Sequence, residues 1–285
     1  DMKAGFRQFP YRILPAVLLL LLSAFLALFE LWRGPGWPEN HEGSAMAMRV
    51  MQYIRSFHGG DFLPIWSPEE NFGMGSPMAL FYPRLFTLLC ALPALAGIPL
   101  KAALVGILTL LGAFGEWGCF RFLRELRLPR PAAFMLCLAF PHLNYVYSDI
   151  VVRGATAEFT AMCILPWLFW WCLRLIRKGK FGYTVILIAT GLFFAHASIF
   201  VFAAPIGILA LLIGYFRHRG RRRKIVETAI RSGLIIGLLI APTLMLTALV
   251  HESYFFEFFY MLGNSPKYSF LLPATLFLGA AGRQT

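Results

Sequence analysis

Long apolar runs separated by short polar stretches dominate the pattern of this chain. A membrane-spanning helix needs about 20 mostly apolar residues, and most of the runs approach that length. The pattern therefore predicts an all-α polytopic membrane protein, with residues 1–285 forming a single transmembrane domain. The apolar segments are 11–32, 79–98, 101–123, 131–148, 157–176, 181–197, 199–216, 225–249 and 268–281.

The composition agrees with this prediction and excludes three other classes of protein. Hydrophobic residues make up 59% of the chain and charged residues 14%, with a mean hydropathy of +0.67. A soluble domain of this size cannot bury so much apolar surface, and neither a disordered chain nor a secreted disulfide scaffold has this composition. The five cysteines all lie inside apolar runs without CxxC spacing, so they indicate small buried side chains rather than a zinc site.

Basic residues indicate which side of the membrane each loop faces. They form clusters at 121–130, 174–180 and 217–224, and further basic residues precede the first apolar run. The positive-inside rule places these clusters and the N-terminus in the cytoplasm. The net charge of +12 is therefore an orientation signal, and no nucleic-acid partner is expected. We expect a multi-pass protein of the cytoplasmic (inner) membrane.

The segment 79–98 is expected not to cross the membrane. If it crossed, the cluster at 121–130 would lie outside, against the positive-inside rule. Pro83 and Pro93 also interrupt helical hydrogen bonding in this segment. We therefore predict an interfacial or re-entrant helix on the outer face, within a first extracytoplasmic loop and its juxtamembrane helices at 33–100. The other eight segments then cross the membrane.

With this topology the outer face collects most of the polar chemistry. Of the 14 acidic residues, ten fall at or near it, together with four of the 6 histidines. A functional site is therefore expected at this face. The residues are Glu30, Glu39, Glu42, Asp61, Glu69, Glu70, Asp149, Glu158, Glu252, Glu257, His41, His58, His196 and His251.

Short motifs at this face follow Glu42 in a fixed order. They are Gly-x-x-x-Pro-x-Trp at 60–66, Gly-x-Gly-x-Pro at 73–77, Tyr82-Pro83, and Arg-Gly-Ala-x-Ala-Glu at 153–158. Through these landmarks, residues 11–260 resemble the bacterial membrane protein family labelled "6-pyruvoyl-tetrahydropterin synthase-related", which is similar to the GT-C superfamily of polytopic glycosyltransferases. No residue here supports the enzyme activity that the family label names.

Two features depart from that superfamily. The acidic pair usually written Asp-x-Asp or Glu-x-Asp is replaced here by Glu39-Asn40-His41-Glu42, and Ala45 stands where the family often has a histidine. Members also commonly continue into further helices or a soluble C-terminal domain. The resemblance therefore leaves open a C-terminal part that is missing or separate.

The resemblance implies an inverting glycosyltransferase that uses a polyprenyl-phosphate-linked sugar donor at the extracytoplasmic face. In such a reaction an acceptor hydroxyl loses its proton as it attacks the anomeric carbon, and a carboxylate within hydrogen-bond reach acts as general base. We assign this role to Glu42, with Glu39 as the alternate. The alternative is that both are ordinary solvated loop acids.

The leaving group would be a lipid phosphate, on which negative charge grows in the transition state, so that cations placed beforehand stabilise it. Arg153 is the first candidate because it precedes Gly154, where backbone can approach closely, and Arg49, Arg84 and Lys267 add charge. A divalent cation, Mg²⁺ or Mn²⁺, held by acids or histidines is the other source of positive charge.

Further outer residues complete the predicted substrate site. Arg153 has a structural alternative, an ion pair with Glu158, although residues five apart do not stack well on a regular helix. His196 either contacts substrate or, as a neutral side chain, only bonds to a backbone carbonyl. Most aromatic residues fit an interfacial belt, but Trp66 and Tyr82 can stack on a sugar. The remaining predicted contacts are Glu158 itself, Asp149, His41 and Glu252.

Two other functions fit the same pattern. One is a lipid or polysaccharide transporter or flippase, although no internal repeat was found and the polar residues gather at one face rather than at the midplane. The other is a non-catalytic membrane subunit of an envelope polysaccharide assembly complex, which the irregular acidic motif favours. The expected partners are accordingly the lipid-linked sugar donor, membrane lipids and subunits of such a complex.

Overall fold

The computed structural model describes residues 9–38, 40–70 and 73–251. Within these ranges most of the chain is helical, and no strand is present apart from one isolated bridge between Ser67 and Ser76. This confirms the predicted all-α class. The main helices are α1 (Phe9–Ala27), α2 (Phe29–Arg33), α3 (Gly43–His58), α4 (Met78–Phe81), α5 (Leu85–Leu95), α6 (Leu100–Glu125), α7 (Arg130–Leu138), α8 (Asn144–Ser148), α9 (Thr156–Lys178), α10 (Thr184–Ala195), α11 (Ala197–Arg217) and α12 (Arg222–His251).

Among the described residues, five helical stretches are long and apolar enough to cross a membrane. This supports a membrane-embedded protein. Three further apolar helices are shorter, at 14–27, 85–95 and 184–195, and the predicted segment 268–281 lies outside the described residues. The count of eight crossings therefore stays a prediction. The five long stretches are Leu100–Glu125, Arg130–Arg153, Thr156–Lys178, Ala197–Arg217 and Arg219–Leu249.

The segment predicted not to cross, 79–98, forms two short helices rather than one long one. Helix α5 has 11 residues and so rises about 16 Å, roughly half of the 30 Å hydrocarbon core. Pro83 precedes it, and Gly97 with a φ of +91° follows it. This length fits a helix that does not span the bilayer.

The segment predicted at 131–148 is interrupted and continues further than expected. Helix α7 ends at Leu138, a 3₁₀ turn covers Phe140–His142, α8 follows, and a π-helical turn spans Asp149–Arg153. Pro141 supplies no backbone N–H, which explains the break after α7. The irregular end brings Asp149 and Arg153 to the start of α9.

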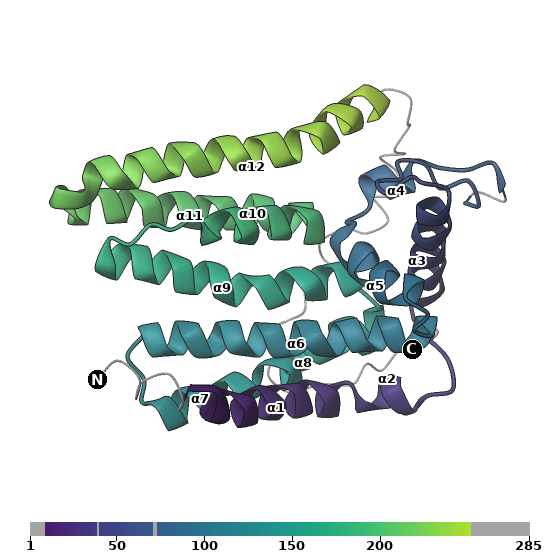
Figure 1. Ribbon diagram of the computed structural model, residues 1–285, viewed down its shortest axis with the longest axis horizontal. Helices are drawn as coiled ribbons and strands as arrows, with labels where there is room; N and C mark the ends of the chain where they lie inside the picture. Colours follow the sequence, from purple (N-terminus) through teal and green to yellow (C-terminus); the bar gives the residue numbers. More distant parts are fainter. Residues whose placement is uncertain (1–8, 39, 71–72, 252–285) are drawn as a thin grey trace, which may run out of the picture. The chain divides into compact units, whose positions relative to one another are not determined.

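Helix α6 lies between α1 and α9 in the centre of the helix packing (Figure 1). Its glycines face both neighbours: a Cβ on Gly112 would lie 3.1 Å from the Cβ of Ala24, and one on Gly115 would lie 3.2 Å from the Cα of Cys163. Small residues let helix backbones approach closely in membranes, where packing replaces the hydrophobic effect between helices. The glycines of α6 therefore allow α1 and α9 to pack closely against it.

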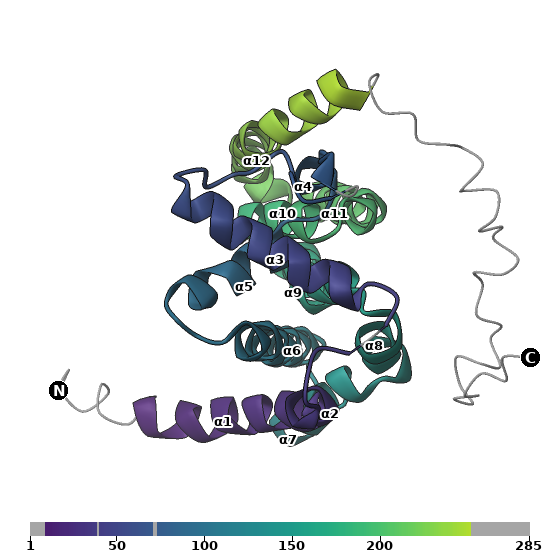
Figure 2. The same cartoon turned by 90° about the vertical axis from the view of Figure 1, so that its right-hand side faces the viewer.

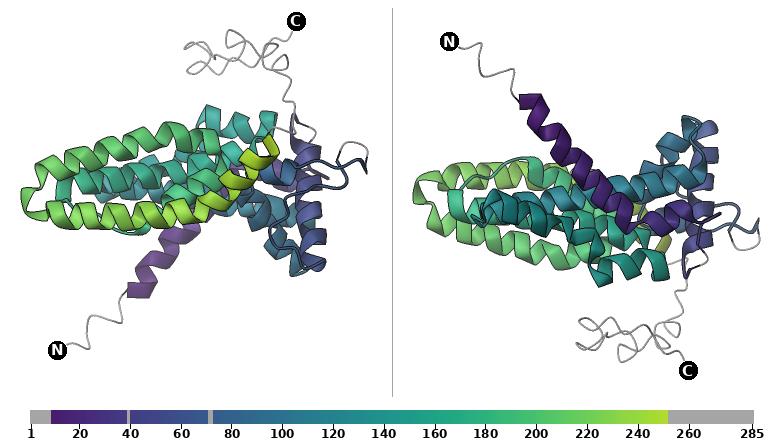
Figure 3. Two further views of the ribbon diagram at one scale, coloured as in Figure 1. Left: turned by 90° about the horizontal axis from the view of Figure 1, so that it is seen from above. Right: turned by 90° about the horizontal axis from the view of Figure 1, so that it is seen from below.

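Two ends of this packing differ in chemistry. The loop end, which comprises the described residues of 33–98 together with 149–158, contains α3, α4 and α5 and lies where α6 and α9 begin (Figure 1). Figure 2 looks onto this end and shows α3 lying across it, and Figure 3 shows the same arrangement from above and below. The basic end contains the clusters 121–130, 174–180 and 217–224, where α6, α9 and α11 end.

By its internal contacts the chain divides into Asp1–Ala241 and Pro242–Thr285. The described part of the second unit is the last stretch of α12, from Pro242 to His251. Both sites considered below lie in the first unit.

Candidate functional site

Helix α3 positions the first part of the loop-end site. Met46, Val50 and Tyr53 form its buried face, while Glu42 stands at its N-terminal boundary. Buried apolar side chains at this helical spacing anchor α3 on the other helices. As a result Glu42 and Arg49, two turns apart, share the side of α3 that faces Tyr82.

Glu42, Arg49 and Tyr82 form one interacting group. The Tyr82 hydroxyl donates a hydrogen bond to Oε2 of Glu42, and Nη1 of Arg49 lies 3.9 Å from the same oxygen. The Arg49 guanidinium also lies over the Tyr82 ring, 3.6 Å from its centroid, in a cation–π arrangement. The Glu42 side chain remains 40% exposed. One carboxylate oxygen is thus held while the residue stays open to solvent.

The protonation of Tyr82 follows from this geometry. Burial first, and the hydrogen bond to Glu42 second, raise the pKa of Tyr82 well above its ordinary value. Tyr82 therefore remains a neutral donor at neutral pH. Its hydroxyl proton points to Glu42, which acts as the acceptor.

A second group surrounds Arg153. Its Nη1 lies 2.6 Å from Oδ1 of Asp149 and 2.9 Å from Oε2 of Glu158, and Tyr145 donates to the other oxygen of Glu158. Asp149 is completely buried, whereas Arg153 is half exposed. The structural alternative for Arg153, an ion pair with Glu158, is therefore present.

The five-residue separation of Arg153 and Glu158 was expected to be unfavourable, and the local backbone explains why the pair forms. The π-helical turn Asp149–Arg153 ends at Gly154, which has a φ of +71° in the left-handed region. The chain changes direction at Gly154 before α9 begins at Thr156. Arg153 and Glu158 are therefore not on one regular helix. The spacing argument applied to a regular helix, and the backbone between these two residues is not one.

Asn40 joins the first loop to this turn, and sequence reasoning missed it. Its Nδ2 donates to the carbonyls of Ile150 (3.2 Å) and Val151 (3.4 Å). A Cβ at Gly154 would lie 2.1 Å from Oδ1 of Asn40. The polar residue inside the Glu39–Glu42 stretch, together with the glycine after Arg153, was the only signal of this contact in the sequence.

Trp66 packs on the glycine-containing motif at 73–77 rather than on the Glu42 group. A Cβ on Gly75 would lie 2.5 Å from its indole nitrogen, so the ring covers this glycine, whose φ is +81°. Ser67 and Ser76 exchange two backbone hydrogen bonds of 2.7 and 2.9 Å beside it. The motifs at 60–66 and 73–77 thus form one folded turn, with Trp66 half exposed on it.

Two arginines at the loop end carry buried N–H groups that lack hydrogen-bond partners among the described residues. These are Nε and Nη1 of Arg49 and Nε and Nη2 of Arg84, a residue only 7% exposed. Burial raises the pKa of Tyr53 to about 12, and the positive charge of Arg84 opposes that shift. Buried N–H groups without hydrogen-bond partners are costly, and for Arg49 the nearby Glu42 carboxylate offsets part of that cost.

The closed space beside these arginines is small. The cavity lined by Arg49, Tyr53 and Tyr82 has a volume of about 10 Å³, at the lower limit for holding one water molecule. An anion larger than water would therefore have to approach Arg49 from the open side of Glu42 or displace a wall.

The remaining predicted residues are dispersed. His41 is exposed, and His196 caps α11 by accepting a 3.4 Å hydrogen bond from the Ile199 N–H through Nδ1. The partner is a backbone N–H rather than the backbone carbonyl expected for the structural role of His196, and its substrate contact stays a prediction. Glu39 and Glu252 lie outside the described residues.

No metal-binding cluster was found in the part of the chain that the structure describes, where no three His, Cys, Asp or Glu side chains are placed to hold an ion. The divalent cation expected from the chemistry stays untested. Of the basic residues at the loop end, those predicted to face the substrate are Arg49, Arg84 and Arg153.

Comparisons with protein-family models, curated proteins and solved structures found no match to this chain. The class that the fold defines is an α-helical membrane protein with a polar loop end. Any more specific function rests on the residues of the loop end.

Proposed function

We propose that this protein is an integral-membrane glycosyltransferase of the GT-C type, which transfers a sugar from a polyprenyl-phosphate-linked donor with inversion. The observation that supports it is the Glu42 group, in which a half-open carboxylate accepts a hydrogen bond from Tyr82 beside the Arg49 guanidinium. Asn40 holds the Arg153 turn against the same loop. A base and cations therefore meet at one end of the molecule.

In the proposed reaction, Glu42 takes the proton of an acceptor hydroxyl. Tyr82 and Arg49 engage its Oε2, which leaves Oε1 to receive that proton. The acceptor oxygen bonds to the anomeric carbon while the bond from that carbon to the lipid phosphate breaks. The phosphate leaves with the electron pair, and Arg49, Arg84 and Arg153 stabilise its charge.

The proposal includes an orientation. The basic end faces the cytoplasm by the positive-inside rule, and the loop end then faces away from it, in the inner membrane. The N-terminus lies in the cytoplasm. This is the side on which an extracytoplasmic sugar acceptor would be met.

A transporter or flippase remains the second candidate, and one observation favours it. Glu116 in the middle of α6 is fully buried, and neither of its carboxylate oxygens has a hydrogen-bond partner among the described residues. Ionisable groups inside spanning helices commonly mark transport or proton pathways. The 10 Å³ cavity at the loop end instead favours the third candidate, a non-catalytic membrane subunit.

The decisive experiment supplies purified protein with polyprenyl-phosphate sugars and follows sugar transfer. Glu42→Gln is expected to lower the rate by about 100-fold or more, because loss of a general base typically costs that much. Arg153→Ala is expected to lower it as well. Glu69→Gln, in the same loop and paired with Arg55, is the matched control and is expected to change the rate less than about twofold.

Two outcomes would contradict the proposal at different levels. If transfer occurs and Glu42→Gln leaves it unchanged, the base assignment is wrong but the enzyme proposal stands. If no donor is bound or consumed by the wild type, the enzyme proposal itself fails.

A further inference from the structure

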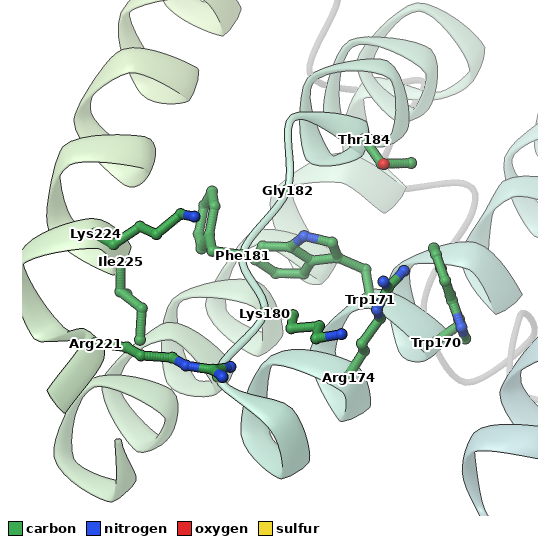
Figure 4. A pocket seen from close by; sticks show the side chains of 11 residues that line it. Trp170, Trp171, Arg174, Lys180, Phe181, Gly182, Thr184, Arg221, Lys224 and Ile225 are labelled. Carbon is green, nitrogen blue, oxygen red and sulfur yellow. The ribbon is translucent and has the colours of Figure 1, made fainter. Parts of the chain in front are cut away.

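The basic end contains a cavity that the proposed sugar chemistry does not use. It holds about 510 Å³ and opens between the end of α9 and the start of α12. Figure 4 shows its walls, with Trp170 and Trp171 on one side and the loop that enters α10 across it. The lining residues that carry the argument are Trp171, Arg174, Lys180, Phe181, Arg221 and Lys224.

The charges around this cavity are all positive. Arg174, Lys180, Arg221 and Lys224 line it, and no acidic side chain does. Within the described residues, none of these four forms an ion pair; Arg174 lies over the Trp170 ring and Arg221 donates to a backbone carbonyl.

Neighbouring basic residues at the same end behave differently. Lys178 is paired with Glu125, and Arg223 is paired with Glu227. An orientation signal requires only that basic residues lie on the correct side of the membrane. It does not require four unpaired cations to converge on one cavity, and this convergence calls for an anion.

An apolar groove adjoins the cavity. It holds about 250 Å³ between α9, α10, α11 and α12, and it shares Trp171 and Phe181 with the basic cavity as common walls. Apart from Ser232 and the indole N–H of Trp171, its lining is hydrocarbon, aromatic ring and glycine. A soluble phosphate has no apolar part that could fill this groove, whereas an acyl chain does.

Two buried polar atoms in these walls lack partners. The indole Nε1 of Trp171, a residue 4% exposed, and Oγ of Ser232, a residue 2% exposed, have no hydrogen-bond partner among the described residues. Buried donors of this kind are normally satisfied. An ester or phosphate oxygen is an acceptor that would satisfy the indole N–H of Trp171, which lies at the wall shared with the basic cavity.

We propose that the cavity and the groove together bind one anionic phospholipid. Its phosphate headgroup lies among Arg174, Lys180, Arg221 and Lys224, and an acyl chain follows the groove toward Ser232. The indole N–H of Trp171, at the common wall, donates to an oxygen between headgroup and chain. The site is separate from the Glu42 group. The proposal does not depend on which side of the membrane the basic end faces.

The headgroup contact is tested on the purified full chain in neutral detergent, by titration with phosphatidylglycerol and phosphatidylcholine. Lys180→Gln/Lys224→Gln is expected to weaken phosphatidylglycerol binding about tenfold or more, since each basic side chain near an anionic lipid contributes substantially. Arg219→Gln/Arg223→Gln removes the same charge from the same end without touching the cavity lining, and is expected to change binding less than about twofold. Equal losses in the two variants, or none in the first, would overturn the headgroup site.

The acyl groove is tested by filling it. A Cβ on Gly233, which lines the groove, meets no atom within 4 Å, so Gly233→Leu can enter the groove without disturbing the helix packing. It is expected to weaken phosphatidylglycerol binding about fivefold or more, from the apolar contact it displaces. Gly106→Leu, also into open space but on α6, is the control and is expected to bind like the wild type.

Pyrophosphate distinguishes a lipid from a soluble phosphate. It is expected to compete only weakly with phosphatidylglycerol, because it occupies the cavity without the groove. If pyrophosphate displaces the lipid completely and Gly233→Leu binds like the wild type, the ligand is a soluble phosphate and the lipid proposal is wrong.

Discussion

At the scale of single residues, Gly154 controls how the first loop meets the Arg153 turn. Its φ of +71° is unfavourable for any side chain, and a Cβ would overlap Oδ1 of Asn40. We expect Gly154→Ala to cost about 1–3 kcal/mol, measured as a lower melting temperature in detergent. Gly220→Ala is the control, because its Cβ meets open space at ordinary φ. Equal melting of the two variants would show that the Asn40 contact does not constrain the turn.

The raised pKa of Tyr82 predicts how the stability of the folded protein changes with pH. Its pKa in the folded protein is raised above the usual value of about 10, so folding favours the protonated phenol. The stabilising contribution is complete below about pH 10 and is lost as the pH rises through the raised pKa. We therefore expect the melting temperature of the wild type to fall more steeply above pH 10 than that of Tyr82→Phe.

The control for that measurement is Tyr183→Phe, which removes the hydroxyl of an exposed tyrosine at the start of α10. Its curve is expected to follow the wild type. Parallel curves for Tyr82→Phe and wild type would mean that the Tyr82 hydroxyl contributes nothing to folding at Glu42.

At the scale of elements, apolar periodicity predicted the existence of helices better than their continuity. The long helices α6, α9 and α11 follow apolar runs that are readable from the sequence alone. The breaks around Pro141 and in the turn Asp149–Arg153 depend on contacts with other helices, which no local pattern contains. For the candidate site, the sequence likewise predicted which types of residue are present but not which of them pair.

Asn40 and Glu158 make this concrete. Asn40 reads as a missing acid in a motif, yet its amide joins the loop to the carbonyls of Ile150 and Val151. Glu158 reads as poorly spaced from Arg153, yet the π-helical turn brings the two side chains together. A one-dimensional spacing argument assumes a regular helix and fails where the backbone is irregular.

The short helix α5 carries a prediction about topology. If the segment 79–98 does not cross the membrane, positions before and after it lie on the same side. Asp61→Cys and Ile98→Cys, both at exposed positions, are therefore expected to react with a membrane-impermeant maleimide from the same side of sealed vesicles. Labelling from opposite sides would show that the segment crosses. Wild-type protein gives the background, since four of the five cysteines are buried.

At the scale of the whole molecule, charge is separated along the helices rather than spread evenly. The basic clusters gather where α6, α9 and α11 end, and the acids of the candidate site gather where α6 and α9 begin. The net charge of +12 therefore consists of a cationic end and a mixed end with paired charges. Both proposals follow from this separation: phosphate lipid chemistry at one end and carboxylate chemistry at the other.

Orientation in the membrane decides whether the proposed reaction has the right setting. The positive-inside rule predicts that Gly220→Cys, between basic residues of the basic end, reacts with an impermeant maleimide only after intact expressing cells are permeabilised. Asp61→Cys in the loop end is expected to react from outside without permeabilisation. The reverse pattern would place Glu42 in the cytoplasm and remove the extracytoplasmic acceptor from the proposal, while the lipid site at the basic end would stand. Because one cysteine lies in the loop end and the other in the basic end, the experiment tests the orientation at two positions and does not depend on catalytic activity.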